Sequence, residues 1–143
     1  MSGERILALD LGERRIGVAV SDPTGLLATP LKAIDLTRSP SAVSEVIRLV
    51  EEYEACEIVV GLPISLSGRS GTQVQRAKRF VDALADQTSV PVVLRDERYT
   101  SVQAERLLRE AGRQPSRDKG RVDSAAAALI LQSLLDSRRT GSG

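Results

Sequence analysis

The order of apolar and polar positions along the chain predicts strands in the first part of the sequence. Residues 5–11 and 16–21 are short apolar runs typical of strands, and the link of residues 12–15 between them suits an antiparallel hairpin. Residues 26–36 are predicted to form a third strand. Pro30 within this segment lacks the backbone N–H that a central strand needs, so we expect the third strand at an edge of the sheet or bulged.

Beyond residue 40 the pattern alternates between helices and strands. The runs 57–62 and 90–94 are apolar and predict strands, the first of them covered on both faces. Apolar residues at helical spacing predict four helices. The first lies around 43–50 after the start signal Ser39-Pro40, and the second lies around 74–84. The third runs from a capping box at Thr100 and Gln103 to Gly112, and the fourth, at about 122–138, should be well buried.

Three strands followed by strand–helix–strand crossovers predict an α/β fold, a five-stranded mixed sheet flanked by helices. The first strand is expected in the middle of the sheet, and the strands after the first and second helices are expected to run parallel to it. We expect a single domain over residues 1–139 and a flexible tail at residues 140–143.

The composition restricts the chemistry that such a domain can perform. The sequence has no histidine, which excludes a histidine general base and metal sites built on imidazole. Tyr53, Phe80 and Tyr99 are the only aromatic residues, and this disfavours base stacking as a means of binding nucleic acid. A hydrolase of this composition has to use carboxylates, lysine, tyrosine or serine, or a hard metal ion bound by oxygen atoms.

A net charge of +1 gives the chain no strong overall field, so contact with nucleic acid requires a local basic patch. Residues 95–121 are a candidate, with eight basic and five acidic residues; the alternative is an ordinary solvated helix face. The single cysteine, Cys56, excludes an intrachain disulfide and is expected to be a small buried hydrophobic residue. The first residues do not form a signal peptide, and no stretch reaches the roughly 18 apolar residues of a membrane helix. We therefore expect a cytoplasmic protein without a membrane partner.

Three carboxylates from distant parts of the sequence are expected to converge on one edge of the sheet. Ligand sites in open α/β sheets lie beyond the carboxyl ends of the parallel strands. Asp10 lies at such an end, Glu97 directly follows the fifth strand, and Asp123 opens the final helix. Taken singly, Asp10 could be an ordinary turn residue and Asp123 an ordinary helix cap. These simpler explanations do not account for Glu97 or for the expected location of all three acids at one edge.

Crowded carboxylates repel one another unless a cation neutralises them. Mg²⁺ prefers oxygen ligands and keeps several waters, which leaves room for a phosphate group. One ion, or two about 4 Å apart, could activate water and stabilise a leaving oxygen. The pattern of acids therefore favours phosphodiester hydrolysis without histidine.

Four motifs occur in order over about residues 5–138. They are Asp10-Leu11-Gly12 with Ile16-Gly17-Val18-Ala19; Val60-Gly61-Leu62-Pro63 with Gly68 and Gly71; Asp96-Glu97-Arg98 with Thr100-Ser101; and Lys119-Gly120-Arg121-Val122-Asp123 with Ala126 and Ile130-Leu131-Gln132. Each motif is weak alone, but together at these spacings they are specific. The chain resembles the YqgF family, also called the RuvX or pre-16S rRNA nuclease family.

The resemblance implies an RNase H-like fold and a Mg²⁺- or Mn²⁺-dependent nuclease that processes the 5′ end of pre-16S rRNA, alone or in a pre-ribosomal particle. It implies that Asp10, Glu97 and Asp123 are the catalytic, metal-binding acids. Lys119 is expected to contact a phosphate, or else to be a solvated loop lysine. Arg98 is expected either to clamp a substrate phosphate or to pair with a neighbouring acid. Gly61 is expected at the substrate-binding edge.

Three alternatives differ in class. A Holliday junction resolvase would need two sites in a dimer, and resolvases of the RuvC type often carry a second acid one turn into the last helix, where this chain has Ala126. An ATPase of the actin-like fold, whose first phosphate motif resembles Asp10-Leu11-Gly12, needs two large domains that 143 residues do not supply. A non-catalytic RNA-binding ribosome-assembly factor would not need all three acids. Monomer and homodimer both stay open.

Overall fold

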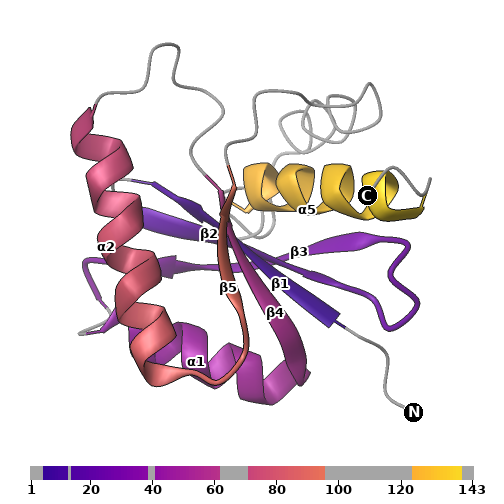
Figure 1. The fold of residues 1–143 in the computed structure, drawn as a ribbon, viewed down its shortest axis with the longest axis horizontal. Helices are drawn as coiled ribbons and strands as arrows, with labels where there is room; N and C mark the ends of the chain where they lie inside the picture. The colour runs from indigo at the N-terminus through magenta and orange to yellow at the C-terminus, as the bar shows by residue number, and fades with distance from the viewer. Residues whose placement is uncertain (1–4, 13, 39–40, 62–70, 96–123, 140–143) are drawn as a thin grey trace.

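The computed structural model describes residues 5–12, 14–38, 41–61, 71–95 and 124–139 (Figure 1). These ranges contain the strands and helices β1 (Arg5–Leu11), β2 (Arg15–Ser21), β3 (Ala28–Asp35), α1 (Ala42–Tyr53), β4 (Ala55–Gly61), α2 (Gly71–Gln87), β5 (Val92–Arg95) and α5 (Ala125–Arg139). The helix expected from Thr100 and the tail at 140–143 lie outside the described residues. The other predicted elements are confirmed, with boundaries that differ by a few residues.

The strands form one mixed sheet in the order β3-β2-β1-β4-β5. Strand β1 is central, antiparallel to β2 and parallel to β4, and β5 runs parallel to β4. This confirms the predicted α/β class and topology. Among the described strands β3 pairs with β2 alone, so Pro30 lies in an edge strand, where its missing N–H does not interrupt the hydrogen bonds of a central strand.

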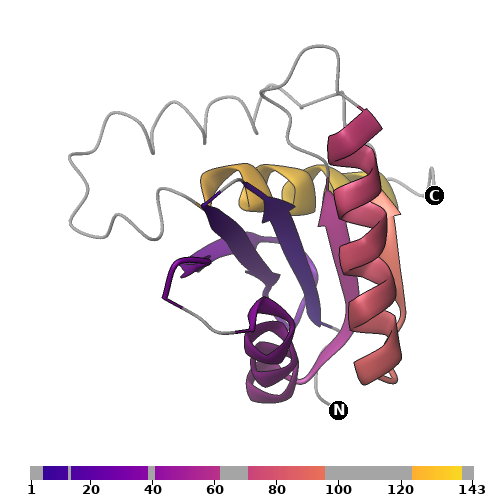
Figure 2. The same ribbon diagram turned by 90° about the vertical axis from the view of Figure 1, so that its left-hand side faces the viewer.

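Helices cover both faces of the sheet. Figures 1 and 2 show α1 and α2 together on one side and α5 on the other. Alternation along β1 divides the core accordingly. Leu7, Leu9 and Leu11 pack on the face of α1 and α2, whereas Ile6 and Ala8 pack under α5. The central strands are therefore buried on both faces, as their continuous apolar runs predict.

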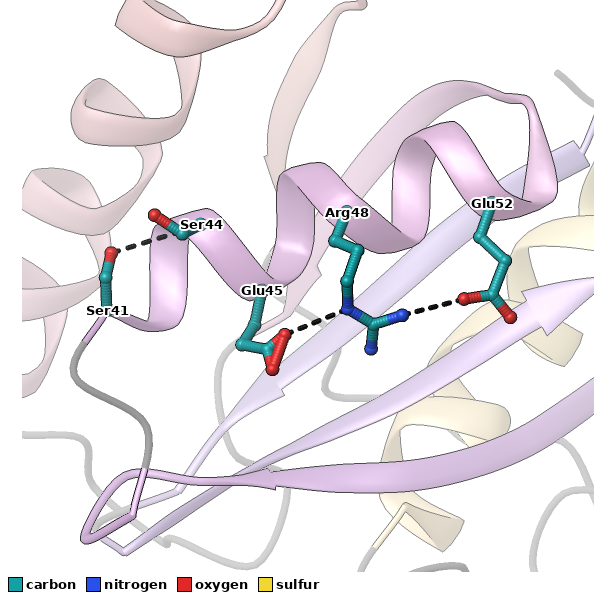
Figure 3. Close-up of polar contacts among 5 residues, drawn as sticks. All are labelled: Ser41, Ser44, Glu45, Arg48 and Glu52. Atoms are coloured by element: carbon teal, nitrogen blue, oxygen red, sulfur yellow. Dashed lines mark hydrogen bonds and ion pairs between the residues drawn. The ribbon is translucent and has the colours of Figure 1, made fainter.

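Helix α1 has well-defined ends and a charged outer face (Figure 3). The Ser41 side chain accepts a hydrogen bond from the backbone N–H of Ser44 at 3.2 Å, so the cap lies two residues after the predicted start signal at Ser39. Arg48 bridges Glu45 at 3.0 Å and Glu52 at 2.8 Å, one turn away on either side. Such exposed pairs contribute only a few tenths of a kcal/mol each, and so the apolar face of α1 decides its position.

The expectation that Cys56 is buried is wrong. Strand β4 begins at Ala55, two residues earlier than predicted, and its register with β1 shifts between the pairs Arg5–Ala55 and Ile6–Glu57. Cys56 is the extra residue in this irregularity, and its side chain is exposed, with the thiol donating to the Arg5 carbonyl oxygen at 3.3 Å. A bulge turns a residue out of the alternation that sequence periodicity assumes.

Helix α5 is tied to the β2–β3 connection by a buried amide. The Gln132 Oε1 accepts from the backbone N–H of Ala28 at 2.9 Å, and the Nε2 donates to the Leu26 carbonyl at 2.9 Å and to Asp136 at 3.1 Å. The side chain therefore satisfies two backbone groups as a neighbouring strand would. Near the C-terminal end of α5, both terminal nitrogens of Arg138 pair with the Glu57 carboxylate, at 3.0 and 2.9 Å. No helix within the described ranges is long and apolar enough to cross a membrane.

We predict that Gln132→Leu lowers the free energy of unfolding by about 2 kcal/mol, because it leaves a backbone N–H and a carbonyl without partners. Urea denaturation followed by circular dichroism measures the change. Ser133→Ala on the same helix is the control, because the buried Ser133 hydroxyl has no hydrogen-bond partner among the described residues. Equal stability of Gln132→Leu and the wild type would show that the Gln132 amide does not hold the β2–β3 connection against α5.

Candidate functional site

The candidate site is built on a row of residues across four strands. Asp10 is paired with Gly17 of β2 on one side and with Gly61 of β4 on the other, and Gly61 is paired with Arg95 of β5. Adjacent strands are about 4.8 Å apart, so the backbones of Asp10 and Arg95 are separated by about 10 Å. Asp10 thus has a glycine on either side in this row, and neither neighbour offers its carboxylate a side-chain partner.

The Asp10 side chain lies on the face of the sheet that α5 covers, since it alternates with Leu9 and Leu11 on the opposite face. Its Oδ1 atom is buried and has no hydrogen-bond partner among the described residues. Burial raises the pKa of this carboxyl from 3.8 to about 6. A buried carboxylate oxygen without a donor is unfavourable in the ionised form, and a bound cation would supply the missing interaction.

The turn that follows Asp10 requires glycine. The Gly12 N–H donates to the Arg15 carbonyl at 3.0 Å and closes the β1–β2 connection. A Cβ atom at Gly12 would lie 2.5 Å from that carbonyl oxygen, closer than real Cβ atoms come. The Asp10-Leu11-Gly12 motif therefore combines the acid with the residue that lets the chain reverse directly after it.

Gly61 has a packing role. A Cβ atom at this position would collide with the Cδ1 atom of Ile130 in α5, so the absence of a side chain lets the helix cross the end of β4. The predicted contact of Gly61 with substrate is not tested by this packing and stays a prediction. What the structure shows is that Asp10 and Gly61 are neighbours on adjacent strands, as their place at the strand ends predicts.

The start of α5 is fixed to β2 by a serine that the sequence analysis did not single out. Ser124 is fully buried, and its hydroxyl oxygen accepts a hydrogen bond from the backbone N–H of Val18 at 2.9 Å. Its carbonyl accepts from Ala128 N–H at 3.0 Å, and α5 begins at the next residue, Ala125. Among the described residues α5 follows directly on Ser124, and a serine just before a long apolar helix is the signal that could have revealed its role.

The remaining predicted site residues lie outside the described residues. These are Glu97, Arg98, Lys119 and Asp123, together with all of the basic patch 95–121 except Arg95. Chain connectivity still relates two of the acids to described elements. Glu97 follows the last residue of β5 by two positions, and Asp123 immediately precedes Ser124. Among the described residues, no three acidic or cysteine side chains form a group able to hold a metal ion.

Comparison with known families gives a match over almost the whole chain. The sequence profile of the RuvX family, described as Holliday junction resolvase, matches residues 4–137. The chain belongs to the RuvX family. Relatives named pre-16S rRNA nuclease include one from Chloroflexus aurantiacus, 45% identical over 98% of this chain and 92% of its own length, and one from Mycobacterium ulcerans, 47% identical over 97% and 82%.

Solved structures similar to this RuvX-family chain have the same fold. Thermus thermophilus RuvC in complex with a Holliday junction matches with a TM-score of 0.55 and 17% identity, over 95% of this chain and 96% of that one. The yeast mitochondrial Holliday junction resolvase matches with a TM-score of 0.52 and 16% identity, over 97% and 83%. At such identities the likeness concerns the fold alone, and it confirms the expected RNase H-like architecture.

We predict that Gly61→Ala lowers the free energy of unfolding by about 1–3 kcal/mol, because the buried Ile130 side chain, or α5 with it, has to shift to admit the added methyl group. Ile130→Val, which removes Cδ1, should cost about 1 kcal/mol alone. Combined, the two substitutions should cost less than the sum of the single changes, because the collision is relieved. A double-mutant cycle by urea denaturation measures this coupling, and strict additivity would contradict the packing role of Gly61.

We predict that Asp10→Asn stabilises the metal-free protein at neutral pH. The raised pKa means that the folded wild type holds its Asp10 proton more tightly than the unfolded chain, so its stability falls as the pH rises from about 4 to about 6 and stays lower above that. The Asn variant lacks this titration, and the difference in unfolding free energy should grow over that range to the order of 2 kcal/mol. Thermal unfolding in EDTA from pH 4 to 8 measures it, and a constant difference would refute the buried-charge interpretation.

Proposed function

We propose that this chain is a metal-dependent nuclease that hydrolyses phosphodiester bonds, with pre-16S rRNA as its substrate. The observation that carries the proposal is the Asp10 carboxylate, which has a buried oxygen without a partner at the carboxyl end of the central strand. Ligand sites of open α/β sheets lie at such strand ends. The names of the relatives, pre-16S rRNA nuclease, support the substrate.

The described part of the site fits a hard divalent cation. Asp10 offers an oxygen ligand whose buried Oδ1 has no donor among the described residues, and its two neighbours in the row are glycines without a donor side chain. We propose Glu97 and Asp123 as the further ligands, since the sequence has no histidine to supply imidazole. Bound Mg²⁺ or Mn²⁺ would lower the pKa of a water molecule and stabilise negative charge at the phosphate.

The chain's own residues would bind and orient the substrate. Arg98 and Lys119 are proposed as phosphate contacts, because both belong to the locally basic segment 95–121. Gly61 is proposed to allow close approach of the nucleic-acid backbone at the end of β4. The burial of Asp10 keeps water from competing for its carboxylate and strengthens its interaction with any positive charge placed there.

RNA is proposed over a four-way DNA junction for two reasons. The curated relatives carry the name pre-16S rRNA nuclease. In addition, α5 has Ala126 one turn beyond Asp123, the position at which resolvases of the RuvC type often carry a second acid. Junction resolution remains the second candidate, favoured by the description of the family as Holliday junction resolvase. A cytoplasmic location is proposed because rRNA processing takes place there.

We predict that the purified protein cleaves a 5′-extended 16S rRNA fragment with Mg²⁺ or Mn²⁺ and that EDTA stops the reaction. Asp10→Asn should reduce the rate at least about 100-fold, because a metal-held charge interaction is worth several kcal/mol in the transition state. Gel analysis of the products under single-turnover conditions measures the rate.

Asp86→Asn is the matched control for this assay. It makes the same change of charge at an exposed position on α2, across the sheet from Asp10, and it should leave cleavage unchanged. A single-stranded RNA and a four-way DNA junction complete the panel. Symmetric cutting of the junction alone would assign the chain to the resolvases. Binding of the rRNA fragment without cleavage of any substrate would instead favour the non-catalytic assembly factor.

A further inference from the structure

The row of residues that contains Asp10 continues beyond Gly17 into the edge strand β3. The pairing of β2 with β3 shifts by one residue at Gly17, so that two residues of β3, Lys32 and Ala33, stand opposite Gly17 alone. An extra residue of this kind is a β-bulge, which turns a side chain out of the regular alternation and is frequent beside active sites. The bulge therefore lies in the same row as Asp10, two strands away from it.

Lys32 lies towards the same face of the sheet as Asp10. The residues of β3 on either side of the bulge, Leu31 and Ile34, both pack with the apolar cluster under α1 and α2. The two residues between them therefore lie towards the opposite face, to which the Asp10 side chain also belongs. Adjacent strands are about 4.8 Å apart, so the backbones of Lys32 and Asp10 are separated by about 10 Å. The Lys32 side chain is exposed.

The positive charge of Lys32 is not neutralised by the nearby acid on its own strand. Asp35 Oδ1 accepts from the backbone N–H of Thr37 at 2.9 Å and from its hydroxyl at 2.6 Å, and Asp35 Oδ2 lies 3.8 Å from Arg38 Nε. Within the described ranges, Lys32 takes part in no ion pair. An exposed ammonium group without a carboxylate partner can bind an anion without first breaking another contact.

Two further exposed cations continue this charge to the edge of the sheet. Arg14 lies in the β1–β2 connection, and its carbonyl accepts from Leu36 N–H at 2.9 Å, which joins it to the end of β3. Arg38 follows two residues later. Because β3 is antiparallel to β2, it ends at the same edge as β1. Lys32, Arg14 and Arg38 are called here the β3-side patch, which starts in the row of Asp10 and reaches the edge where β1 ends.

The opposite edge of the sheet carries a group of acids. Glu51, Glu52 and Glu54 are exposed at the end of α1, directly before β4 begins. Strand β4 is parallel to β1, so its beginning lies at the edge remote from Asp10. The net charge of +1 therefore includes a separation of charge between the two edges. A polyanion that approaches the described part of the chain is directed towards the β3-side patch.

We propose that Lys32 binds a backbone phosphate of the nucleic acid on the β3 side of Asp10, and that Arg14 and Arg38 bind the same strand as it continues to the edge of the sheet. This role rests on the proposed function, in which Asp10 belongs to the site that cleaves the strand. Lysine and arginine form charge-assisted hydrogen bonds with phosphate oxygens. Such contacts fix the position of a nucleic acid without reading its sequence.

Protection of the edge strand is a different role that Lys32 could have. Charged residues and proline in an edge strand hinder its pairing with another chain, and β3 contains both Lys32 and Pro30. The two roles differ in their response to a change of sign. Lys32→Glu keeps a charge that hinders pairing between edges, but that charge repels phosphate. RNA affinity and self-association, measured on the same variants, therefore separate the two roles.

The test is binding of the full chain to a 5′-extended 16S rRNA fragment in EDTA, measured by fluorescence anisotropy at several salt concentrations. Lys32→Gln should weaken binding about tenfold, since a charge-assisted contact is lost. It should also reduce the slope of log affinity against log salt by about 0.7 to 0.9, the change expected for one phosphate contact. Lys32→Glu should weaken binding further, and Lys32→Arg should retain most of the affinity.

Lys78→Gln is the matched control. It makes the same substitution at an exposed lysine of α2, which covers the face of the sheet opposite Asp10, and it should bind RNA as the wild type does. Circular dichroism and gel filtration of each variant show whether it is folded and whether it self-associates. Lys32→Glu should elute as the wild type does. If only Lys32→Gln loses affinity and it also self-associates, while Lys32→Glu binds RNA normally, Lys32 protects the edge and the phosphate role is overturned.

The remaining outcomes separate this role from the proposed function. Wild-type affinity in Lys32→Gln, or an equal loss in Lys78→Gln, would overturn the phosphate contact, and the nuclease function would stand if the wild type cleaves the fragment with Mg²⁺. Loss of affinity in Lys32→Gln together with a wild type that cleaves nothing would support the contact and refute the nuclease function. Failure of the wild type to bind the fragment would overturn both.

Discussion

The close packing of α5 against the sheet is the constraint on which the rest of the molecule depends. The sheet face beneath the helix carries small residues, including Ala8, Ala19 and Gly61, and the helix meets them with Ala127 and Ala128. Small side chains on both surfaces allow a short separation between helix and sheet, and buried hydrogen bonds through Ser124 and Gln132 fix the position of the helix on that face. Because Asp10 lies on the same face, this packing also buries the candidate acid.

Burial of Asp10 has opposite effects on stability and function. An ionised carboxylate with an unsatisfied oxygen destabilises the folded chain, whereas the same group in a poorly hydrated site interacts strongly with a cation. The glycines that flank Asp10 in the row supply no side-chain donor that would satisfy the acid. Stability lost at a site of this kind is recovered elsewhere, here in two apolar layers that cover both faces of the sheet.

Proteins named for different nucleic acids share this fold. Structures with Holliday junction substrates share the architecture at 17% identity or less, while relatives at about 45% identity carry an RNA-processing name. Fold alone does not decide substrate, because substrate choice depends on the residues around the site. Ala126, which the sequence analysis contrasts with resolvases of the RuvC type, is a half-buried position near the start of α5.

The sequence by itself determined the central place of β1, the parallel direction of β4 and β5 and the family, because these follow from the order of the elements and from motif spacing. From the missing N–H of Pro30 it also predicted that β3 lies at an edge or is bulged, and the structure has it at the edge. It also placed Asp10 and Gly61 at neighbouring strand ends. Only the tertiary structure decided that Gly61 accommodates Ile130, that Ser124 binds Val18, and that a bulge exposes Cys56. Such contacts join residues up to 106 positions apart, and local patterns carry no information on how closely a helix approaches a sheet.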